Sequence, residues 1–149
     1  MGGQQFANHR PLLDLRSLDR VRRLNAERGL LEMEAGATWP AVIQATQRLQ
    51  PGGQIWGIRQ KQTGAEDLTL GGAFAENIQG RGLTKRPFVN DVEAVTFVDG
   101  DAGIRRCSRS EQAGLQGLLA GGYGHFGIIA TIRLCVAPRL SSPRRVCVL

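Results

Sequence analysis

Residues 92–108 constrain the fold of this chain most, because they alternate in the manner of β-strands. Along residues 92–98 the side chains separate into two faces, with Val92, Ala94, Thr96 and Val98 on one and Glu93, Val95 and Phe97 on the other. The turn-forming sequence Asp-Gly-Asp-Ala-Gly occupies residues 99–103, and a second extended run follows at 104–108. These residues therefore predict a β-hairpin and, with it, antiparallel strand pairing.

Further strands and helices are predicted on both sides of this hairpin. Extended pieces are expected at residues 11–15, 21–24, 30–35 and 128–136. A helix is expected from Thr38, as N-cap, to Leu49, with Pro40 in its first turn and the Pro-Gly-Gly of residues 51–53 ending it. A shorter helix is expected from Ser110 to Leu119. The order of these elements predicts an α+β fold with a mostly antiparallel sheet.

Length and composition limit the class of protein. The 149 residues suffice for one domain with a hydrophobic core and are too few for two ordinary domains. Hydrophobic residues make up 42% and charged residues 21%, which excludes a disordered or membrane-embedded chain. No apolar run approaches the roughly 20 residues that a bilayer requires, and the first ten residues lack a signal-peptide core. We therefore expect no membrane span and a cytoplasmic location.

The basic charge and the cysteines indicate neither nucleic-acid binding nor a metal site. The net charge is +6 and the isoelectric point is near 10.2, but the basic residues are scattered and few aromatic residues are interleaved with them. Cys107, Cys135 and Cys147 form no C-x-x-C pair, so they predict neither a disulfide framework nor a zinc site. We expect ordinary buried or half-buried thiols, no metal and no nucleic-acid partner.

Residues 60–83 carry two glycine-containing openings and a run of small residues. Gly71 and Gly72 precede Ala-Phe-Ala, which predicts backbone N–H groups at or near a helix start, where anions are favoured. The second opening is Gly80-Arg81-Gly82. The alternative is a tight turn that leads into a small-residue helix packed in the core. Both alternatives stay open on the sequence.

Gly122, Gly124 and Gly127 match G-x-G-x-x-G in a context that excludes a classical Rossmann loop. A Rossmann loop follows a strand and begins a helix, whereas here a predicted helix precedes the loop and a strand follows it. Three glycine-rich segments in one small domain, at Gly2-Gly3, in residues 71–82 and in residues 121–127, favour a long phosphate-containing cofactor. Backbone donors can bind pyrophosphate without a dedicated basic residue.

No catalytic constellation is evident, so the catalytic residues stay unassigned. His9 and His125 are the only histidines, and neither has a carboxylate at a telling spacing. No G-x-S-x-G, H-E-x-x-H or Walker sequence is present. Any chemistry is expected to come from a cofactor or from residues outside the chain.

Six ordered motifs resemble the FAD-binding domain of the FAD-linked oxidases of the vanillyl-alcohol oxidase and p-cresol methylhydroxylase type. They are MGGQQ, PLLDLRSLDRV, LLEMEAGATWPAVIQA, TGAEDLTLGGAFAENIQGRG, DVEAVTFVDGDAGIRRCS and GGYGHFGIIATIRL. The resemblance covers residues 1 to about 138. It implies FAD as cofactor and a domain that corresponds mainly to the second half of the family's FAD-binding domain, the antiparallel sheet with its helices.

The resemblance also implies a set of FAD-contacting residues in three groups. The end of the first phosphate loop corresponds to Gly2, Gly3 and Gln4. The central segment along pyrophosphate, ribityl and flavin corresponds to Thr63, Gly64, Thr69, Gly71, Gly72, Asn77 and Gly80. The adenine-side backbone contacts correspond to Gly122, Gly127, Ile128 and Ile129.

Two departures from the family pattern affect these expectations. Gln79 stands where the family often has His, just before the glycine of the central motif. The N-terminal βαβ part and the substrate domain are expected to be missing, so that residues 1–138 form a partial FAD-binding domain and residues 139–149 a linker or the start of a substrate domain.

The resemblance implies a flavin-dependent oxidoreductase that oxidises an alcohol or sugar hydroxyl by hydride transfer to flavin. The isolated chain is expected to bind FAD weakly or not at all and to lack turnover, and another chain could complete it. The alternatives are an inactive truncated fragment and a basic, non-enzymatic binding module.

Overall fold

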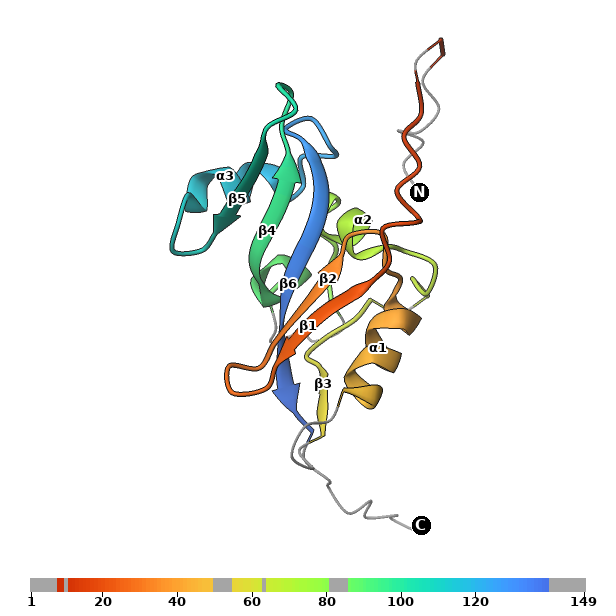
Figure 1. Ribbon diagram of the computed structural model, residues 1–149, viewed down its shortest axis with the longest axis vertical. Helices are drawn as coiled ribbons and strands as arrows, with labels where there is room; N and C mark the ends of the chain where they lie inside the picture. Colours follow the sequence, from red (N-terminus) through yellow and green to blue (C-terminus); the bar gives the residue numbers. More distant parts are fainter. Residues whose placement is uncertain (1–7, 10, 50–54, 63, 81–85, 140–149) are drawn as a thin grey trace.

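An antiparallel sheet organises the computed structural model, which describes residues 8–9, 11–49, 55–62, 64–80 and 86–139. Five strands follow the order β1-β2-β6-β4-β5, and a sixth, β3, pairs with the end of β6 (Figure 1). The strands are β1 (Val21–Asn25), β2 (Leu30–Glu34), β3 (Trp56–Ile58), β4 (Val92–Val98), β5 (Ile104–Ser108) and β6 (Ile128–Pro138). The α+β class with a mostly antiparallel sheet is therefore confirmed.

Strand β6 is the centre of this sheet, because β2, β4 and the short β3 all pair with it. Its 11 residues are rich in β-branched and apolar side chains, which fit a strand with neighbours on both sides. Ile132, Leu134 and Val136 alternate into the hydrophobic core. The predicted strand at residues 128–136 is confirmed, and it extends to Pro138 where β3 becomes its partner.

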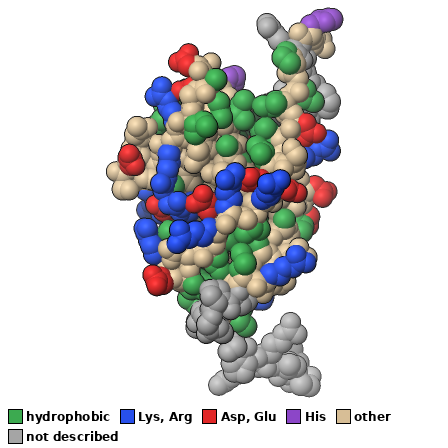
Figure 2. Space-filling view, viewed as in Figure 1, with side chains coloured by type: hydrophobic (Ala, Val, Ile, Leu, Met, Phe, Trp, Pro, Cys, Tyr) green, Lys and Arg blue, Asp and Glu red, His purple; other side chains and the backbone are tan. Residues whose placement is uncertain are grey.

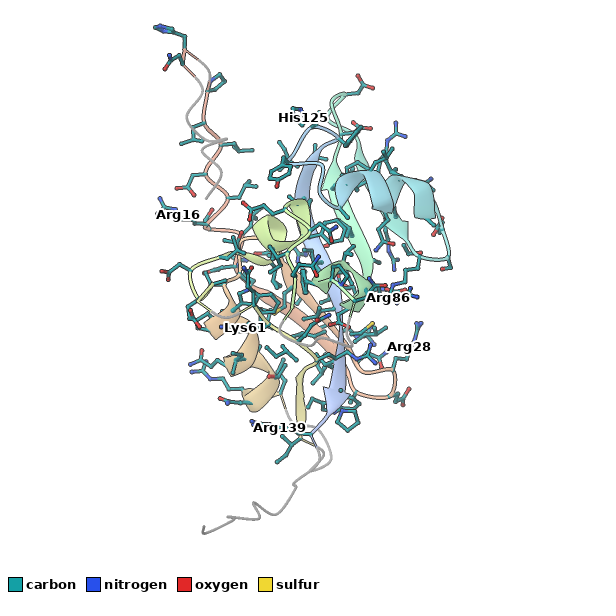
Figure 3. All side chains as sticks on the ribbon, turned by 180° about the vertical axis from the view of Figure 1, so that it is seen from behind. Arg16, Arg28, Lys61, Arg86, His125 and Arg139 are labelled. Atoms are coloured by element: carbon teal, nitrogen blue, oxygen red, sulfur yellow. The ribbon has the colours of Figure 1, made fainter. Side chains whose placement is uncertain are left out.

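The helices lie on one face of the sheet, as Figure 3 shows from the side opposite to Figure 1. They are α1 (Trp39–Arg48), α2 (Leu70–Ala75), α3 (Ala113–Leu119) and the 3₁₀ helix η2 (Phe88–Asp91). The α1 helix buries Trp39, which is fully inaccessible and meets the Phe88 ring edge-on at 5.1 Å between ring centres. The predicted start of α1 after Thr38 is confirmed, although the Thr38 side chain makes no capping hydrogen bond.

Several local predictions are wrong. Residues 11–15 form no strand, and Leu12 and Leu13 remain 71% and 62% exposed. The helix predicted from Ser110 to Leu119 is α3, and it starts at Ala113 because Gln112 before it adopts a left-handed φ of 57°. Strand β3 was not anticipated, since three residues that only complete the edge of β6 give no periodic signal.

The predicted hairpin forms, but the side chains of β4 do not separate into the two faces that strict alternation predicts. Strands β4 and β5 pair from Ala94–Ser108 to Val98–Ile104. The register of β4 against β6 shifts between Val92 and Ala94. The shift puts Val92, Val95 and Phe97 together in the core, although strict alternation separates Val92 from the other two.

Charged side chains cross the middle of the opposite face of the sheet (Figure 2). The Arg133 guanidinium of β6 forms ion pairs with the Glu32 carboxylate at 2.7 Å and with the Glu93 carboxylate at 3.5 Å. These pairings, above all the hydrogen bond to Glu32, raise the pKa of Arg133. Glu34 is buried and accepts hydrogen bonds from the Arg20 backbone N–H at 3.0 Å and the Arg22 guanidinium at 2.7 Å. These contacts lower the pKa of Glu34.

Two of the three cysteines lie in the described part of the chain. Cys107 is buried and Cys135 half-buried, both as free thiols, and burial raises the pKa of each. Cys147 and the Pro-Gly-Gly at residues 51–53 lie outside the described residues. Among the described helices, none has the length and apolar character needed to cross a bilayer. The described residues also contain no cluster of His, Cys, Asp and Glu side chains suited to a metal ion.

Candidate cofactor cleft

Four chain segments enclose a cleft of about 450 Å³ beside the first residues of β6. They are the coil before β1, the residues just after β2, the α2 helix with its N-cap, and the loop that leads into β6. The described lining residues are Leu13, Leu15, Arg16, Ala35, Gly36, Thr69, Gly71, Gly72, Ala75, Tyr123, Gly124, Gly127, Ile128 and Ile129. This volume lies in the range of small-molecule and cofactor sites.

The α2 wall begins at Thr69, whose hydroxyl accepts a hydrogen bond from the Gly72 N–H at 3.1 Å. The Leu70 N–H donates to the Ala37 carbonyl at 2.8 Å, and the Gly71 N–H donates to the Ala35 carbonyl at 2.7 Å. The first N–H groups of α2 are thus already paired within the chain. The prediction of bare N–H groups at this helix start is therefore wrong.

Close packing accounts for Gly71. A Cβ atom at Gly71 would lie 3.0 Å from the Ala35 Cβ and 3.1 Å from the Ala35 carbonyl oxygen. The first turn of α2 therefore packs so closely against the end of β2 that a side chain at this position would push Ala35 aside. Of the two interpretations of this glycine pair, the structure favours a turn that leads into a packed small-residue helix.

The loop before β6 differs, because it presents a donor to the cleft. Tyr123 and Gly124 have positive φ values of 50° and 82°, and the His125 N–H donates back to the Gly122 carbonyl at 2.9 Å, as in a type I′ turn. The Gly124 N–H donates to no described residue. A Cβ atom at Gly124 would meet nothing within 4 Å, so this backbone is open to a ligand.

The residues implied by the family resemblance fall into three sets. Those that line the cleft are Thr69, Gly71, Gly72, Gly127, Ile128 and Ile129. Those outside the described residues are Gly2, Gly3, Gln4 and Thr63. Those that do not line the cleft are Gly64, Asn77, Gly80 and Gly122.

Each residue of the last set has a local reason for its identity. Asn77 follows the end of α2 with a left-handed φ of 49°, which Asn tolerates better than most residues do. Gly80 lies directly against the Gln60 side chain, and Gly122 against the Leu118 carbonyl. Gly64 has a φ of 73°. Conformation and packing within the chain are sufficient to explain all four.

Eight of the described lining residues are not among those that the resemblance assigns to FAD contact: Leu13, Leu15, Arg16, Ala35, Gly36, Ala75, Tyr123 and Gly124. The run at residues 11–15 reads as an ordinary strand in the sequence, and only its exposure indicates another role. Ala35 and Gly36 stand at the end of a predicted strand, within a small-residue sequence that could have indicated close approach. Gly124 lies in residues 121–127, which the sequence predicts as a cofactor segment, but the resemblance does not assign it an FAD contact.

Arg16 supplies the only cationic side chain among the described lining residues. Its guanidinium binds Asp14 at 2.6 Å, and both groups are well exposed at the rim. Hydrogen bonds from Arg16 lower the pKa of the Asp14 carboxyl to about 2. Apart from the hydroxyl-bearing Thr69 and Tyr123, the rest of the described wall is apolar side chain and glycine backbone. A largely apolar wall that includes the Gly124 N–H, with the Arg16–Asp14 pair at its rim, suits a ligand that combines flat rings with phosphate, so these residues fit FAD.

Comparisons with known proteins agree with this chemistry. The sequence model of a family described as "FAD binding domain" matches residues 1–108. An uncharacterized oxidoreductase, ORF5 in the fasciation locus of Rhodococcoides fascians, is 30% identical over 137 residues, which cover 91% of this chain and 30% of the relative. Cytokinin dehydrogenase 1 of Arabidopsis thaliana is 24% identical over 91% of this chain and 23% of its own length.

A third relative, cytokinin dehydrogenase 7 of Oryza sativa subsp. japonica, is 28% identical over 97% of this chain and 27% of its own length. The chain therefore spans less than a third of the length of these three curated relatives.

Proposed function

Because this chain belongs to the FAD binding domain family, we propose that it forms part of the FAD-binding surface of an oxidoreductase that oxidises an alcohol or sugar hydroxyl. The cofactor is FAD and the general activity is that of FAD-linked oxidoreductases. The observation that carries the proposal is the largely apolar cleft formed by four separate segments, with the Gly124 N–H, which has no acceptor among the described residues, in its wall.

In this proposal, different described residues contribute different contacts to FAD. Ile128, Ile129 and Leu15 would give FAD apolar contacts from two of the four segments. The Gly124 N–H would donate a hydrogen bond to the ligand, and Arg16, which is paired with Asp14, would lie at the rim. When bound, FAD supplies a flavin ring able to accept a hydride from the substrate. The described lining residues include no His, Asp or Glu, so the base that takes the substrate proton is assigned to a residue elsewhere.

The relatives' names favour a second substrate class. Two of the relatives above are named cytokinin dehydrogenases, and the chain aligns with both along 91% or more of its length. A cytokinin is therefore the alternative to an alcohol or sugar hydroxyl. Steady-state assays of the complete enzyme with both substrate classes distinguish them, when reduction of the flavin is monitored by its bleaching at about 450 nm.

We also propose that residues 1–138 are one portion of a larger FAD-binding unit, with residues 139–149 leading out of it. Less than a third of the length of each relative aligns with this chain. The 149 residues alone should therefore bind FAD weakly and show no turnover. A chain that carries the remainder of the unit would complete the site.

The test is a titration of the ¹⁵N-labelled chain with FAD to millimolar concentration, followed by ¹H–¹⁵N NMR. Saturable shifts are expected for the amides of Gly124, Ile128 and Ile129. A stoichiometric yellow protein would show that binding is tighter than proposed. Absence of shifts throughout, together with steep salt-dependent retention on a polyanion, would replace the proposal by the basic binding module.

A further inference from the structure

Tyr123 occupies a backbone conformation that suits its residue type poorly. It has a φ of 50° and is the first of the two central residues of the turn before β6. Both central positions of such a turn favour Gly, Asn or Asp, and a side chain in the left-handed region costs roughly 1–2 kcal/mol. A tyrosine here needs a compensating reason.

The turn that carries Tyr123 is fixed to the α2 helix. The Tyr123 N–H donates to the Ala75 carbonyl at 3.1 Å, and the Gly121 N–H donates to the Phe74 carbonyl at 3.3 Å. Both acceptors belong to α2, whose first turn forms another wall of the cleft. Tyr123 is therefore held at a defined place in the lining of the cleft, two residues before His125, which Figure 3 labels.

Packing within the described chain does not compensate for the strain at Tyr123. The residue is 50% exposed, and its ring has no aromatic partner among the described residues. Its phenol makes no hydrogen bond to a described residue. A strained backbone, a rigid support and an unpartnered ring at the wall of a cleft together favour a role toward a ligand.

We propose that Tyr123 stacks on a flat heteroaromatic ring of FAD while the adjacent Gly124 N–H donates a hydrogen bond to the same ligand. The proposal rests on FAD binding by this cleft. Apolar residues of the lining, among them Leu13 and Ile128, supply further contact for a planar ring. An aromatic side chain can stack on either ring system of FAD, the adenine or the isoalloxazine. The experiment identifies which of the two rings Tyr123 contacts.

The test compares Tyr123→Asn with Tyr123→Phe, and uses Ala102→Asn as the matched control. Asn suits a left-handed conformation, so Tyr123→Asn should fold and melt about 2–4 °C higher than the unmodified chain. It should also bind FAD about tenfold more weakly in an NMR titration. Tyr123→Phe keeps the ring and should keep the affinity. Ala102, exposed in the β4–β5 turn with a φ of 60°, should gain stability as Asn without any change in FAD binding.

Titrations with ADP and FMN identify the ring. If Tyr123→Asn weakens ADP and not FMN, Tyr123 stacks on adenine, and the reverse result assigns the isoalloxazine. If Tyr123→Asn binds all three ligands as the unmodified chain does, the stacking proposal is overturned while FAD binding by the cleft stands. If the unmodified chain binds none of the three at millimolar concentration, both proposals fail.

Discussion

The two glycine-containing walls of the cleft, residues 69–72 and residues 121–127, look alike in sequence and differ in the structure. In the first, the Leu70, Gly71 and Gly72 N–H groups are paired within the chain. In the second, the Gly124 N–H donates to no described residue, and a Cβ atom there would meet nothing within 4 Å. A glycine-rich segment is thus a possible binding surface only where packing has left its donors unused.

The difference arises from what each segment must do for the fold. Residues 69–72 join the start of α2 to the end of β2, where a side chain at Gly71 would push Ala35 aside. Residues 121–127 reverse the chain between α3 and β6, with Gly122 and Gly127 closely packed and only Gly124 without a neighbour at its Cβ position. Packing therefore closes the first wall, whereas the turn leaves the second wall open at Gly124.

The largest expected effect is at Gly127, which is closely packed, in contrast to Gly124 in the same loop. Gly127 has a φ of 145°, and a Cβ atom there would lie 2.6 Å from a Phe97 ring carbon and 2.7 Å from the Val98 carbonyl oxygen. Gly127→Ala should therefore lower the free energy of unfolding by about 3 kcal/mol. Gly124→Ala, strained in φ but free of contacts, should lose about 1 kcal/mol. Urea unfolding measures the free energy of unfolding of both variants. Equal losses would show that Gly127 is no more closely packed than Gly124.

The next effect concerns the strand end that supports the closed wall. Hydrogen bonds from the Arg20 N–H and from Arg22 lower the pKa of Glu34 below its usual 4.5. A lowered carboxyl pKa contributes stability that is complete above pH 4.5 and is lost as pH falls through the folded-state value.

Glu34→Gln should therefore be less stable than the unmodified chain at neutral pH, and the difference should shrink below pH 4.5. Thermal melts between pH 3 and 7 give the curve. A difference that stays constant over this range would show that the Glu34 charge does not stabilise the end of β2.

A smaller effect is expected at the cap of the closed wall. Thr69→Ala removes the acceptor of the Gly72 N–H and should lower the free energy of unfolding by about 1 kcal/mol. Thr69→Ser retains the hydroxyl and serves as the control. Amide hydrogen exchange at Gly72 should accelerate in the alanine variant alone; unchanged exchange would mean that the N–H is protected by another group.

The smallest effect is expected at the rim. Asp14 and Arg16 are both well exposed, so Asp14→Asn should leave the urea midpoint unchanged. In the unmodified chain, NMR should show the Asp14 carboxyl titrating at about 2 because of its hydrogen bonds from Arg16. Titration near 4 would indicate that Arg16 is not held beside Asp14 in solution.

The fold class and the cofactor family could be predicted from local sequence patterns. Period-two alternation in residues 92–98 and the β-branched run at 128–136 depend on neighbours along the chain, so the hairpin and β6 could be predicted. The Thr-x-Pro start of α1 is equally local. The order of six motifs indicated FAD, which the family match supports.

Only the tertiary structure decided which glycines adjoin an open space. The state of an N–H group depends on residues distant in sequence, such as the Ala35 carbonyl that occupies the Gly71 donor. The exposure of Leu12 and Leu13 likewise follows from the absence of a strand partner for residues 11–15 within the described chain. Tyr123 gives no signal in the sequence, because its importance arises from a backbone angle and from its place beside the cleft.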